Sequence, residues 1–496
     1  MAWYERQQTR KGEMTMDPTF LSAKRQAALI RRGAIGCREL LDHYIARVER
    51  LDSRINAVVV RDFAQARKRA TALDSARGQG ATGRLHGVPM TIKESFDIAG
   101  LPTTWGIPAL KNHKARANSV TVERYLAAGA VFLGKTNVPL NLADWQSFNA
   151  IYGTTGNPWD PARVPGGSSG GSAAALAAGF TGMDTGSDIG ASIRNPAHYC
   201  GVYGHKPSWG ICPQTGHAVF DTIDQLDMAV VGPMARSAED LAIGLDIMAG
   251  SEAAEAAWQL RLPPPRQKTL AGLRVAVMTR HPCSDVDDAM QAELENLAKA
   301  LRRAGAKVSM TARPAFDLAE GHALYIEMLR AITAVGLDDA AAAQWQAVRD
   351  GQAKDDASYY AQMARGITMR HRVFLQNNEQ RQRMRRAWGA FFRDWDVLLT
   401  PPAASPAFAH DHAGERHQRT IAVNGRQVPV VEQMFWAGLA SFYLLPGTVA
   451  PLGLSAGGLP FGVQILGAMY DDRTTIEVAR LLETAWRGFT PPPGWE

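Results

Sequence analysis

The sequence predicts an α/β fold in which helices cover a β-sheet. Two observations support this prediction. Segments of helical periodicity alternate with short apolar runs, as where a helix at 119–128 precedes a strand at 130–134. Residues 433–470 also contain no charged side chain, and prolines and glycines divide them into pieces the length of buried strands. With 496 residues, the chain has room for one large domain or for two or three smaller ones.

The N-terminal part supplies the first of these elements. Leu29, Leu40, Tyr44 and Val48 recur at helical spacing, with charged residues on the opposite face. The expected elements are helices within 18–50 and at 63–73, a strand or buried turn at 55–60, a glycine-bearing loop at 78–83 and a strand at 88–92. Lys93 lies at the end of that last strand, and beside Glu94 it is, taken alone, typical of a surface ion pair.

The rest of the chain continues the alternation. The expected elements are a loop at 135–139, loops and short strands at 200–207 and 230–239, a helix at 240–248, a proline-rich hinge at 262–267, a strand at 273–278, a helix at 287–304, strands at 307–310 and 396–401, and a closing helix at 472–487. The unit at 273–310 belongs either to the same sheet or to an inserted lobe. Residues 315–390 are rich in helix and alanine.

Composition excludes several classes of protein. The net charge of +6 is mild for this length, and no dense basic block indicates nucleic-acid binding. Four scattered cysteines contain no C-x-x-C pair, so neither a disulfide framework nor a zinc site is expected, and a reducing cytoplasm fits best. Residues 1–17 lack the apolar core of a signal peptide and are expected to form a poorly ordered leader, the alternative being a misplaced start upstream of Met14 or Met16. The uncharged segment is too interrupted for a membrane-spanning helix.

One stretch, residues 165–196, has the character of a site. It opens with the loop GGSSGG, continues as the small-residue run SAAALAAG, and ends in the turn SDIGASIR. Glycine clusters let backbone N–H groups approach a ligand without an intervening Cβ. Two such loops around one tightly packed helix indicate a binding or catalytic site.

The three serines near these glycines, Ser168, Ser169 and Ser192, are candidate nucleophiles. A hydroxyl nucleophile needs a base and donors for the developing oxyanion. No Gly-Lys-Ser/Thr follows the glycines, so a phosphate loop is not formed. The loop satisfies G-x-S-x-G, but the prolines and charges of NPWDPARVP exclude the buried strand that a nucleophile elbow needs. Taken alone, GGSSGG is equally compatible with a purely structural loop.

Taken together, the motifs closely resemble the amidase signature family. The resemblance rests on GGSSGGSAAALAAG and DIGASIRNPA with a strand-terminal lysine upstream, and on RINAVV, GVPMTIKE, GKTNVP, GNPWDP, CGVYGHKPS, GPMARSAEDL, DVLLTP and GLPFGVQILG. It covers roughly residues 20–485, with a divergent helical region at about 255–390. It implies a single large domain over about 18–490, built around a mixed, twisted sheet with helices on both faces.

The resemblance also implies a Ser–Ser–Lys triad. Ser192 would be the nucleophile, Ser168 a bridging serine held by a cis peptide, and Lys93 the base, with a pKa that burial lowers. The backbone N–H groups of Ile189, Gly190, Ala191 and Ser192 would stabilise the oxyanion. Leu142, in the loop Asn141–Ala143, and the segment Gln433–Ala437 are candidates for the pocket wall.

Two positions depart from the family pattern. Glu94 follows the lysine where aspartate is usual, and little effect is expected because this side chain is outside the triad. Ala191 stands where a second glycine is favoured; its Cβ restricts the backbone and narrows the acyl side of the pocket. Asp188 and Arg194 flank the nucleophile and are expected to form a buried pair that fixes the loop.

Other polar residues near the motif receive structural interpretations. His198 and His205 are expected to be hydrogen-bonded structural histidines, and Cys200 a packed thiol. The aromatic residues Trp105, Trp145, Phe148, Phe435 and Trp436 suit an aryl or medium-length acyl amide, although each is equally compatible with core packing.

The sequence thus predicts an amidase that hydrolyses a linear carboxylic amide through a Ser192 acyl-enzyme. No metal or cofactor is implied, and neither nucleic acid nor membrane is expected as a partner; a small-molecule amide is the expected partner and a homodimer the default assembly. The alternatives are the catalytic subunit of a tRNA-dependent glutamine amidotransferase, an esterase-like hydrolase, and a non-catalytic binding protein on the same fold. The first needs partner subunits, and the intact Lys93, Ser168 and Ser192 set argues against the last.

Overall fold

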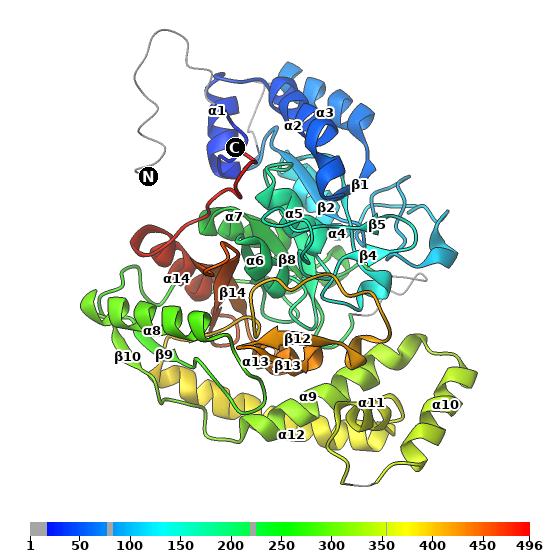
Figure 1. Cartoon of the computed structure of the whole chain (residues 1–496). Coiled ribbons are helices and arrows are strands. Elements are labelled where there is room, and N and C mark those ends of the chain that lie inside the picture. Colours follow the sequence, from blue (N-terminus) through cyan, green and yellow to red (C-terminus); the bar gives the residue numbers. More distant parts are fainter. Residues whose placement is uncertain (1–16, 77–82, 219–224, 354) are drawn as a thin grey trace.

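The centre of the molecule is a mixed β-sheet of eight strands, as the computed structural model shows (Figure 1). The structure describes residues 17–76, 83–218, 225–353 and 355–496. The leader expected at 1–17 and the loop expected at 78–83 therefore lie outside the described residues, apart from Asp17 and Gly83.

The strand order of the large sheet is β10-β9-β11-β15-β14-β7-β8-β6. β9 is parallel to both β10 and β11, and every other neighbouring pair is antiparallel. The unit at 273–310 therefore belongs to the main sheet. The bounds are β6 Asp184–Asp188, β7 Tyr203–Lys206, β8 Val230–Ala235, β9 Arg274–Val277, β10 Lys307–Ser309, β11 Val397–Thr400, β14 Gly447–Leu454 and β15 Pro460–Leu466.

Three further strands form a smaller sheet in the order β1-β3-β2, with β2 parallel and β1 antiparallel to β3. Their bounds are β1 Val58–Arg61, β2 Pro89–Lys93 and β3 Val131–Thr136. Two short hairpins complete the strands: β4 Phe148–Asn149 with β5 Gly153–Thr154, and β12 Thr420–Val423 with β13 Arg426–Pro429. The strand expected at 130–134 runs on to Thr136, into the predicted loop 135–139, because Lys135 and Thr136 pair with β2 on one side and β1 on the other.

Helices pack on both faces of the large sheet. Neighbouring residues of β14 point to opposite faces: Thr448 bonds to Thr475 of α14, whereas Val449 packs with residues of α5 and α6. The bounds are α1 Ala23–Arg31, α2 Cys37–Leu51, α3 Phe63–Ser75, α4 Val120–Ala127, α5 Gly170–Ala177, α6 Arg194–Cys200, α7 Ala238–Met248, α8 Asp288–Arg303, α9 Leu318–Thr333, α10 Asp339–Asp350, α11 Tyr359–Ile367, α12 His371–Asp394, α13 Met434–Ser441 and α14 Asp472–Ala485.

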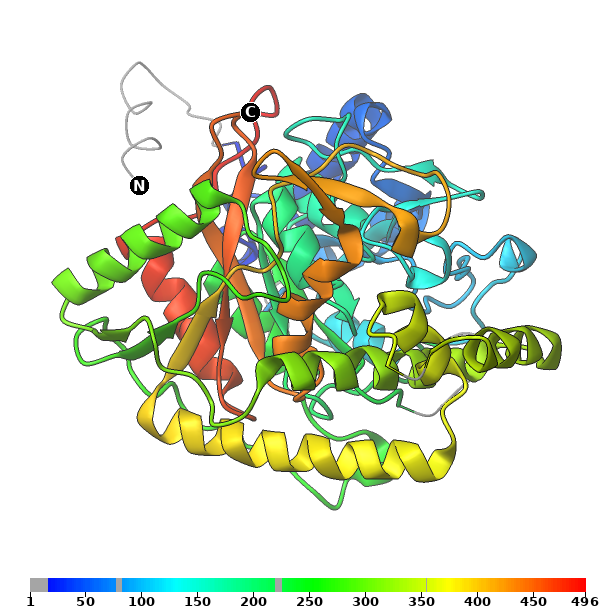
Figure 2. The same cartoon turned by 60° about the horizontal axis from the view of Figure 1, so that its bottom comes forward.

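The helical region α9–α12 lies along one side of the molecule, at the bottom in Figure 1 and towards the viewer in Figure 2. α13 lies between this region and the large sheet. This helix corrects the expectation that residues 433–470 contain only strands. All eight residues of α13 are buried, so the apolar pattern carries no period that separates a helix from a strand.

The two sheets meet where β2 lies beside β6. Thr91 Oγ1 donates to Asp184 Oδ2, and the Gly182 N–H donates to the Pro89 carbonyl at 2.9 Å. This junction brings the end of β2, with Lys93, against the end of β6 and the turn that follows it. Within the described residues, no helix has the length and apolar character needed to cross a membrane.

Candidate active site

The predicted base, Lys93, is the last residue of β2. Its side chain is fully buried, and Nζ donates to Ser168 Oγ at 2.7 Å and to Ser187 Oγ at 2.9 Å. Burial lowers the pKa of Lys93 to about 7, although the carboxylates of Asp188 and Asp184 oppose the shift. Lys93 is therefore not the surface ion-pair residue that its position beside Glu94 would otherwise indicate.

Glu94 is also fully buried and turns away from the lysine. Its carboxylate accepts hydrogen bonds from the Thr104 N–H at 2.7 Å, the Trp105 N–H at 3.0 Å and the Tyr152 hydroxyl at 3.0 Å. These contacts tie the loop at 103–105 to the strand, so Glu94 has a structural place next to the site rather than in it.

Two other buried lysines, Lys135 and Lys206, also have a lowered pKa, but their hydrogen-bond partners differ from those of Lys93. Burial also lowers the pKa of Lys135 to about 8 and that of Lys206 to about 7. Lys206 Nζ, however, donates to the carbonyls of Pro207 and Leu445, and Lys135 Nζ to the Pro102 carbonyl and Thr103 Oγ1. Lys93 is the one of the three whose amine contacts a serine hydroxyl of the glycine loop.

The glycine loop brings Ser168 to Lys93 because its backbone packs closely against the backbone of neighbouring segments at Asn137 and Asp144. A Cβ on Gly167 would lie 2.3 Å from the Asp144 carbonyl oxygen, and one on Gly171 would lie 2.3 Å from the Asn137 nitrogen. The Gly167–Ser168 peptide bond is cis, as the resemblance implied. No strand lies between β5 and β6, a segment that the structure describes in full, so the nucleophile-elbow alternative is wrong for this loop.

Ser192 lies in the turn between β6 and α6 and is 6% exposed. The Ser169 N–H donates to the Ser192 carbonyl at 3.1 Å, which holds the glycine loop against this turn. Asp188 holds the turn from inside, since its carboxylate accepts the N–H groups of Ala191 at 2.9 Å and Ile193 at 3.1 Å.

Asp188 and Arg194 form the buried pair that the sequence predicted. Both side chains are fully buried, and Arg194 Nη2 and Nε donate to the two carboxylate oxygens at 2.9 and 3.0 Å. Burial alone would raise the pKa of Asp188, but the guanidinium reverses the shift and holds this pKa below its usual value. Arg194 also bonds to Gln464 Oε1 and Ser441 Oγ, which links the turn to β15 and α13.

The four predicted oxyanion donors are not equivalent. The Ala191 N–H is bonded to Asp188, so it does not face the reacting oxygen and this part of the expectation is wrong. Ala191 also has φ of 69°, the left-handed conformation that favours glycine, which explains the family's usual residue there. Among the described residues, no hydrogen-bond partner is found for the N–H groups of Ile189, Gly190 and Ser192.

Two aromatic side chains orient the peptide groups of this turn. Trp145 Nε1 donates to the Gly190 carbonyl at 2.8 Å, and the Tyr325 hydroxyl donates to the Ile189 carbonyl at 3.2 Å. Because N–H and C=O point in opposite directions in a trans peptide, the bond from Tyr325 turns the Gly190 N–H to the other side. Tyr325 comes from α9, in the region 315–390, for which the sequence predicted helices but no site residue.

The other pocket candidates divide between site and core. A Cβ on Gly190 would lie 3.3 Å from Met434 Cε, so the segment Gln433–Ala437 does flank the turn. Trp436 is fully buried and donates to Ser284, and Phe435 stacks on His281, so both are core residues. Phe148 stacks on His412, and Trp105 Nε1 donates to the Ser95 carbonyl. Leu142 is half-buried in a short 3-10 turn, and its place in the pocket stays a prediction.

Three neighbouring residues have the structural roles that were predicted for them. His198 contacts the Ser405 carbonyl at 2.9 Å and accepts the Gly462 N–H at 2.8 Å. His205 contacts Thr448 and Asp472. Cys200 is fully buried, and burial raises the pKa of its thiol.

Ser187 is the site residue that the sequence did not reveal. It is the second hydroxyl on Lys93 Nζ, at 2.9 Å. The only sequence feature that pointed to Ser187 was its place in the motif SDIGASIR, and Ser192 lies in the same motif.

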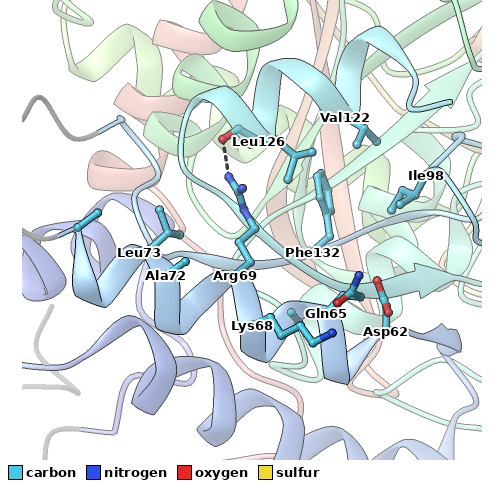
Figure 3. Close-up of a pocket in the computed structure, with 12 residues that line it drawn as sticks. Asp62, Gln65, Lys68, Arg69, Ala72, Leu73, Ile98, Val122, Leu126 and Phe132 are labelled. Atoms are coloured by element: carbon cyan, nitrogen blue, oxygen red, sulfur yellow. Dashed lines mark hydrogen bonds between the residues drawn. The ribbon is translucent and has the colours of Figure 1, made fainter.

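A separate groove of about 680 Å³ lies between α3 and α4 and contains none of the predicted site residues (Figure 3). Apolar side chains such as Leu126 and Phe132 line much of it, and Arg69 donates across it to the Leu126 carbonyl. The polar side chains at its edge include Asp62, Gln65 and Lys68.

Comparison with known proteins decides the family. The Amidase family model matches residues 39–476. The chain belongs to the amidase signature family. It is therefore an amidase, an enzyme that hydrolyses carbon–nitrogen bonds of amides.

Individual relatives of this amidase differ in their activities. It is 33% identical to a glutamyl-tRNA(Gln) amidotransferase subunit of Synechococcus sp. strain CC9605, over 95% of this chain and 97% of the relative. It is 32% identical to the indoleacetamide hydrolase of Bradyrhizobium diazoefficiens, over 93% and 86%. Among solved structures, a bacterial aryl acylamidase of the amidase signature family is 25% identical with a TM-score of 0.77, over 94% of this chain and 96% of that one.

Proposed function

We propose that this amidase hydrolyses a linear carboxylic amide with an aryl or medium-length acyl group, through an acyl-enzyme on Ser192. The observation that supports the proposal most strongly is the contact of the buried Lys93 amine with Ser168, in a loop held against the Ser192 turn. The aryl preference rests on Trp145 beside the turn and on the indoleacetamide hydrolase and aryl acylamidase among its relatives.

The proposed reaction starts from neutral Lys93. With a pKa of about 7, a substantial fraction of the amine has lost its proton at neutral pH. Lys93 takes the proton of Ser168, and Ser168 takes that of Ser192, whose Oγ forms a bond to the amide carbon. The Gly190 and Ser192 N–H groups, with that of Ile189, stabilise the oxyanion, each donor lowering the barrier by about 3 kcal/mol.

The leaving group then departs and water completes the cycle. Ser168 passes its proton to the amide nitrogen as the carbon–nitrogen bond breaks, which leaves the acyl group on Ser192 Oγ. The proton held by Lys93 then returns to Ser168, so that the lysine amine is neutral again. Water attacks the acyl carbon and gives up a proton through Ser168 to Lys93. That proton returns through Ser168 to Ser192 Oγ as the ester bond breaks, the carboxylic acid leaves, and Lys93 is neutral again. Ester hydrolysis is expected as a side activity, because an alkoxide leaves more easily than an amine.

A second candidate function is that of the catalytic subunit of a tRNA-dependent amidotransferase. The 33% identity to an amidotransferase subunit supports it, over nearly the whole of both chains. This function requires partner subunits and glutamine as amide donor. The mild net charge of +6 gives no sign of a tRNA-binding surface, so the free-standing amidase is the preferred proposal.

Steady-state hydrolysis of an amide panel tests the preferred proposal. Suitable substrates are indole-3-acetamide, 4-nitroacetanilide, hexanamide and the matching esters. We expect Ser192→Ala to lose at least about a thousandfold in kcat, because it removes the nucleophile. Ser169→Ala changes the neighbouring loop serine and is expected to stay within about threefold of wild type. Full activity of Ser192→Ala, or its loss in Ser169→Ala alone, would contradict the assignment.

A further inference from the structure

Two arginines and a tyrosine from three separate segments meet in the helical region that also holds the Ser192 turn through Tyr325. Arg330 of α9 and Arg416, at the start of the 3-10 turn Arg416–Gln418, both donate to the hydroxyl of Tyr359, the first residue of α11. The Arg330 guanidinium also lies 5.6 Å from the centre of the Tyr359 ring. We call these three residues the arginine cluster.

The positive charge of the arginine cluster is not balanced. Within the described part of the chain, no carboxylate pairs with Arg330 or Arg416, and the buried Arg330 Nε has no hydrogen-bond partner. Nearby arginines are paired: Arg365 with Glu327 at 2.7 Å and Arg419 with Asp144 at 2.6 Å. A half-buried guanidinium without a counter-charge is unfavourable, because desolvation is not offset.

The excess positive charge of the cluster lowers the pKa of its tyrosine, Tyr359. Burial raises the pKa of the Tyr359 hydroxyl, but the guanidinium groups of Arg330 and Arg416 outweigh burial and leave this pKa below its ordinary value. The surroundings of Tyr359 thus favour a negative charge at this position.

Two links connect the arginine cluster to the residues that hold the Ser192 turn. Arg416 Nη1 donates to the Ala143 carbonyl at 3.1 Å, two residues before Trp145, which holds the Gly190 carbonyl. Arg330 lies five positions after Tyr325 on α9, an axial rise of about 7.5 Å, and Tyr325 holds the Ile189 carbonyl. The Arg330 charge reaches the Tyr325 hydroxyl and lowers its pKa, although burial dominates and raises it.

We propose that the arginine cluster is a subsite for a carboxylate carried by the substrate. The substrate class is then an amide with a free carboxylate a few bonds from the amide carbon, such as the monoamide of a dicarboxylic acid. The planar fork of Arg330 suits a carboxylate, which would accept hydrogen bonds from the unpartnered Nε and, in place of the Tyr359 hydroxyl, from Nη2. This inference rests on the proposed function, since it places the carboxylate relative to the Ser192 turn.

Calorimetric titration of the inactive Ser192→Ala protein tests the subsite separately from catalysis. The probes are succinamate, glutaramate and adipamate, each compared with the neutral amide of the same length, butyramide, valeramide or hexanamide. We expect at least one anionic amide to bind tighter than its neutral counterpart. Adding Arg330→Gln should reduce that preference at least tenfold.

Two further variants complete the test. Arg416→Gln should also reduce the preference and gives a second reading if Arg330→Gln fails to fold. Arg349→Gln is the matched control: Arg349 is half-buried in the same helical region, where it bonds to Thr368, and the preference should be unchanged. Equal binding of charged and neutral amides, or a preference unaltered by both cluster variants, would overturn the inference.

The outcome for the subsite can be separated from that for the proposed function. If wild type hydrolyses neutral amides through Ser192 but shows no preference for a carboxylate, the subsite alone is refuted. If wild type hydrolyses no amide while the Ser192→Ala protein binds the anionic probes through Arg330, the proposed function alone is refuted.

Discussion

At the scale of single residues, the proposed chemistry depends on the surroundings of Lys93. Its amine is removed from solvent and donates hydrogen bonds to two serine hydroxyls. Asp188, the carboxylate with the largest electrostatic effect on Lys93, is paired with Arg194. Burial therefore shifts the equilibrium towards the neutral amine, which is the form that the proposed mechanism needs near neutral pH.

The pH profile of kcat/KM should report this shift. The proposed mechanism requires neutral Lys93, so activity should rise as the pH passes through about 7 and level off above it. A rise centred near pH 10, where an exposed lysine titrates, would contradict the role of burial. The measurement is kcat/KM for one neutral amide between pH 5 and 10.

The same shift links Lys93 to stability. Between about pH 7 and about 10.4, the unfolded chain binds a proton that the folded chain lacks, so this residue's contribution to stability increases with pH. Relative to a Lys93→Met variant, wild type should become more stable over that window. Urea unfolding of both proteins at pH 7, 8.5 and 10 measures the difference.

At the scale of elements, α9 supports the turn that carries Ser192. Tyr325 reaches from this helix to the Ile189 carbonyl, and it passes close to α13, where a Cβ on Gly438 would lie 2.7 Å from Tyr325 Cδ1. The turn is thus held by Asp188 from inside, by Trp145 from the loop after the smaller sheet, and by Tyr325 from the helical region.

Removing the Tyr325 hydroxyl should lower kcat more than it changes KM. Tyr325→Phe loses one hydrogen bond to the peptide that presents the Gly190 N–H, and a loss of about tenfold in kcat is expected. Tyr203→Phe is the matched control, because Tyr203 is equally buried and no partner is found for its hydroxyl among the described residues. Equal effects of the two variants would indicate general packing rather than positioning.

At the scale of the whole molecule, the site forms where the two sheets meet. Lys93 ends β2 of the smaller sheet, Ser187 lies in β6 at the edge of the larger one, and Ser168 comes from the loop between them in sequence. None of these residues is a chain neighbour of another, so the order of the strands, rather than any local motif, creates the contact.

This arrangement explains what the sequence could and could not predict. The alternation of helices and strands, the Asp188–Arg194 pair and the contact of Lys93 with Ser168 could be predicted, because the resemblance links motifs far apart in the chain. Ser187 and Tyr325 could not, since a lone serine or tyrosine in a strand or helix has no pattern of its own. The helix α13 was missed because it is buried on all sides and therefore has no amphipathic pattern. The bond from the Ala191 N–H to Asp188 was missed because the direction of a backbone group depends on the conformation of the turn.

The purified chain should be active without any other protein. A free-standing amidase should turn over aryl or acyl amides at a rate that added cell extract does not increase. Amide hydrolysis that appears only in the presence of partner subunits, with glutamine preferred, would support the amidotransferase alternative instead. Turnover of 4-nitroacetanilide and release of glutamate from glutamine, each with and without extract, decide between the two.

The measurement that tests the central claim most directly is intact-mass spectrometry after exposure to a fluorophosphonate. If Ser192 is the activated nucleophile, wild type gains the mass of a single adduct and Ser192→Ala gains none. An unlabelled wild type, or equal labelling of Ser192→Ala, would contradict the assignment and direct attention to Ser168 and Ser169.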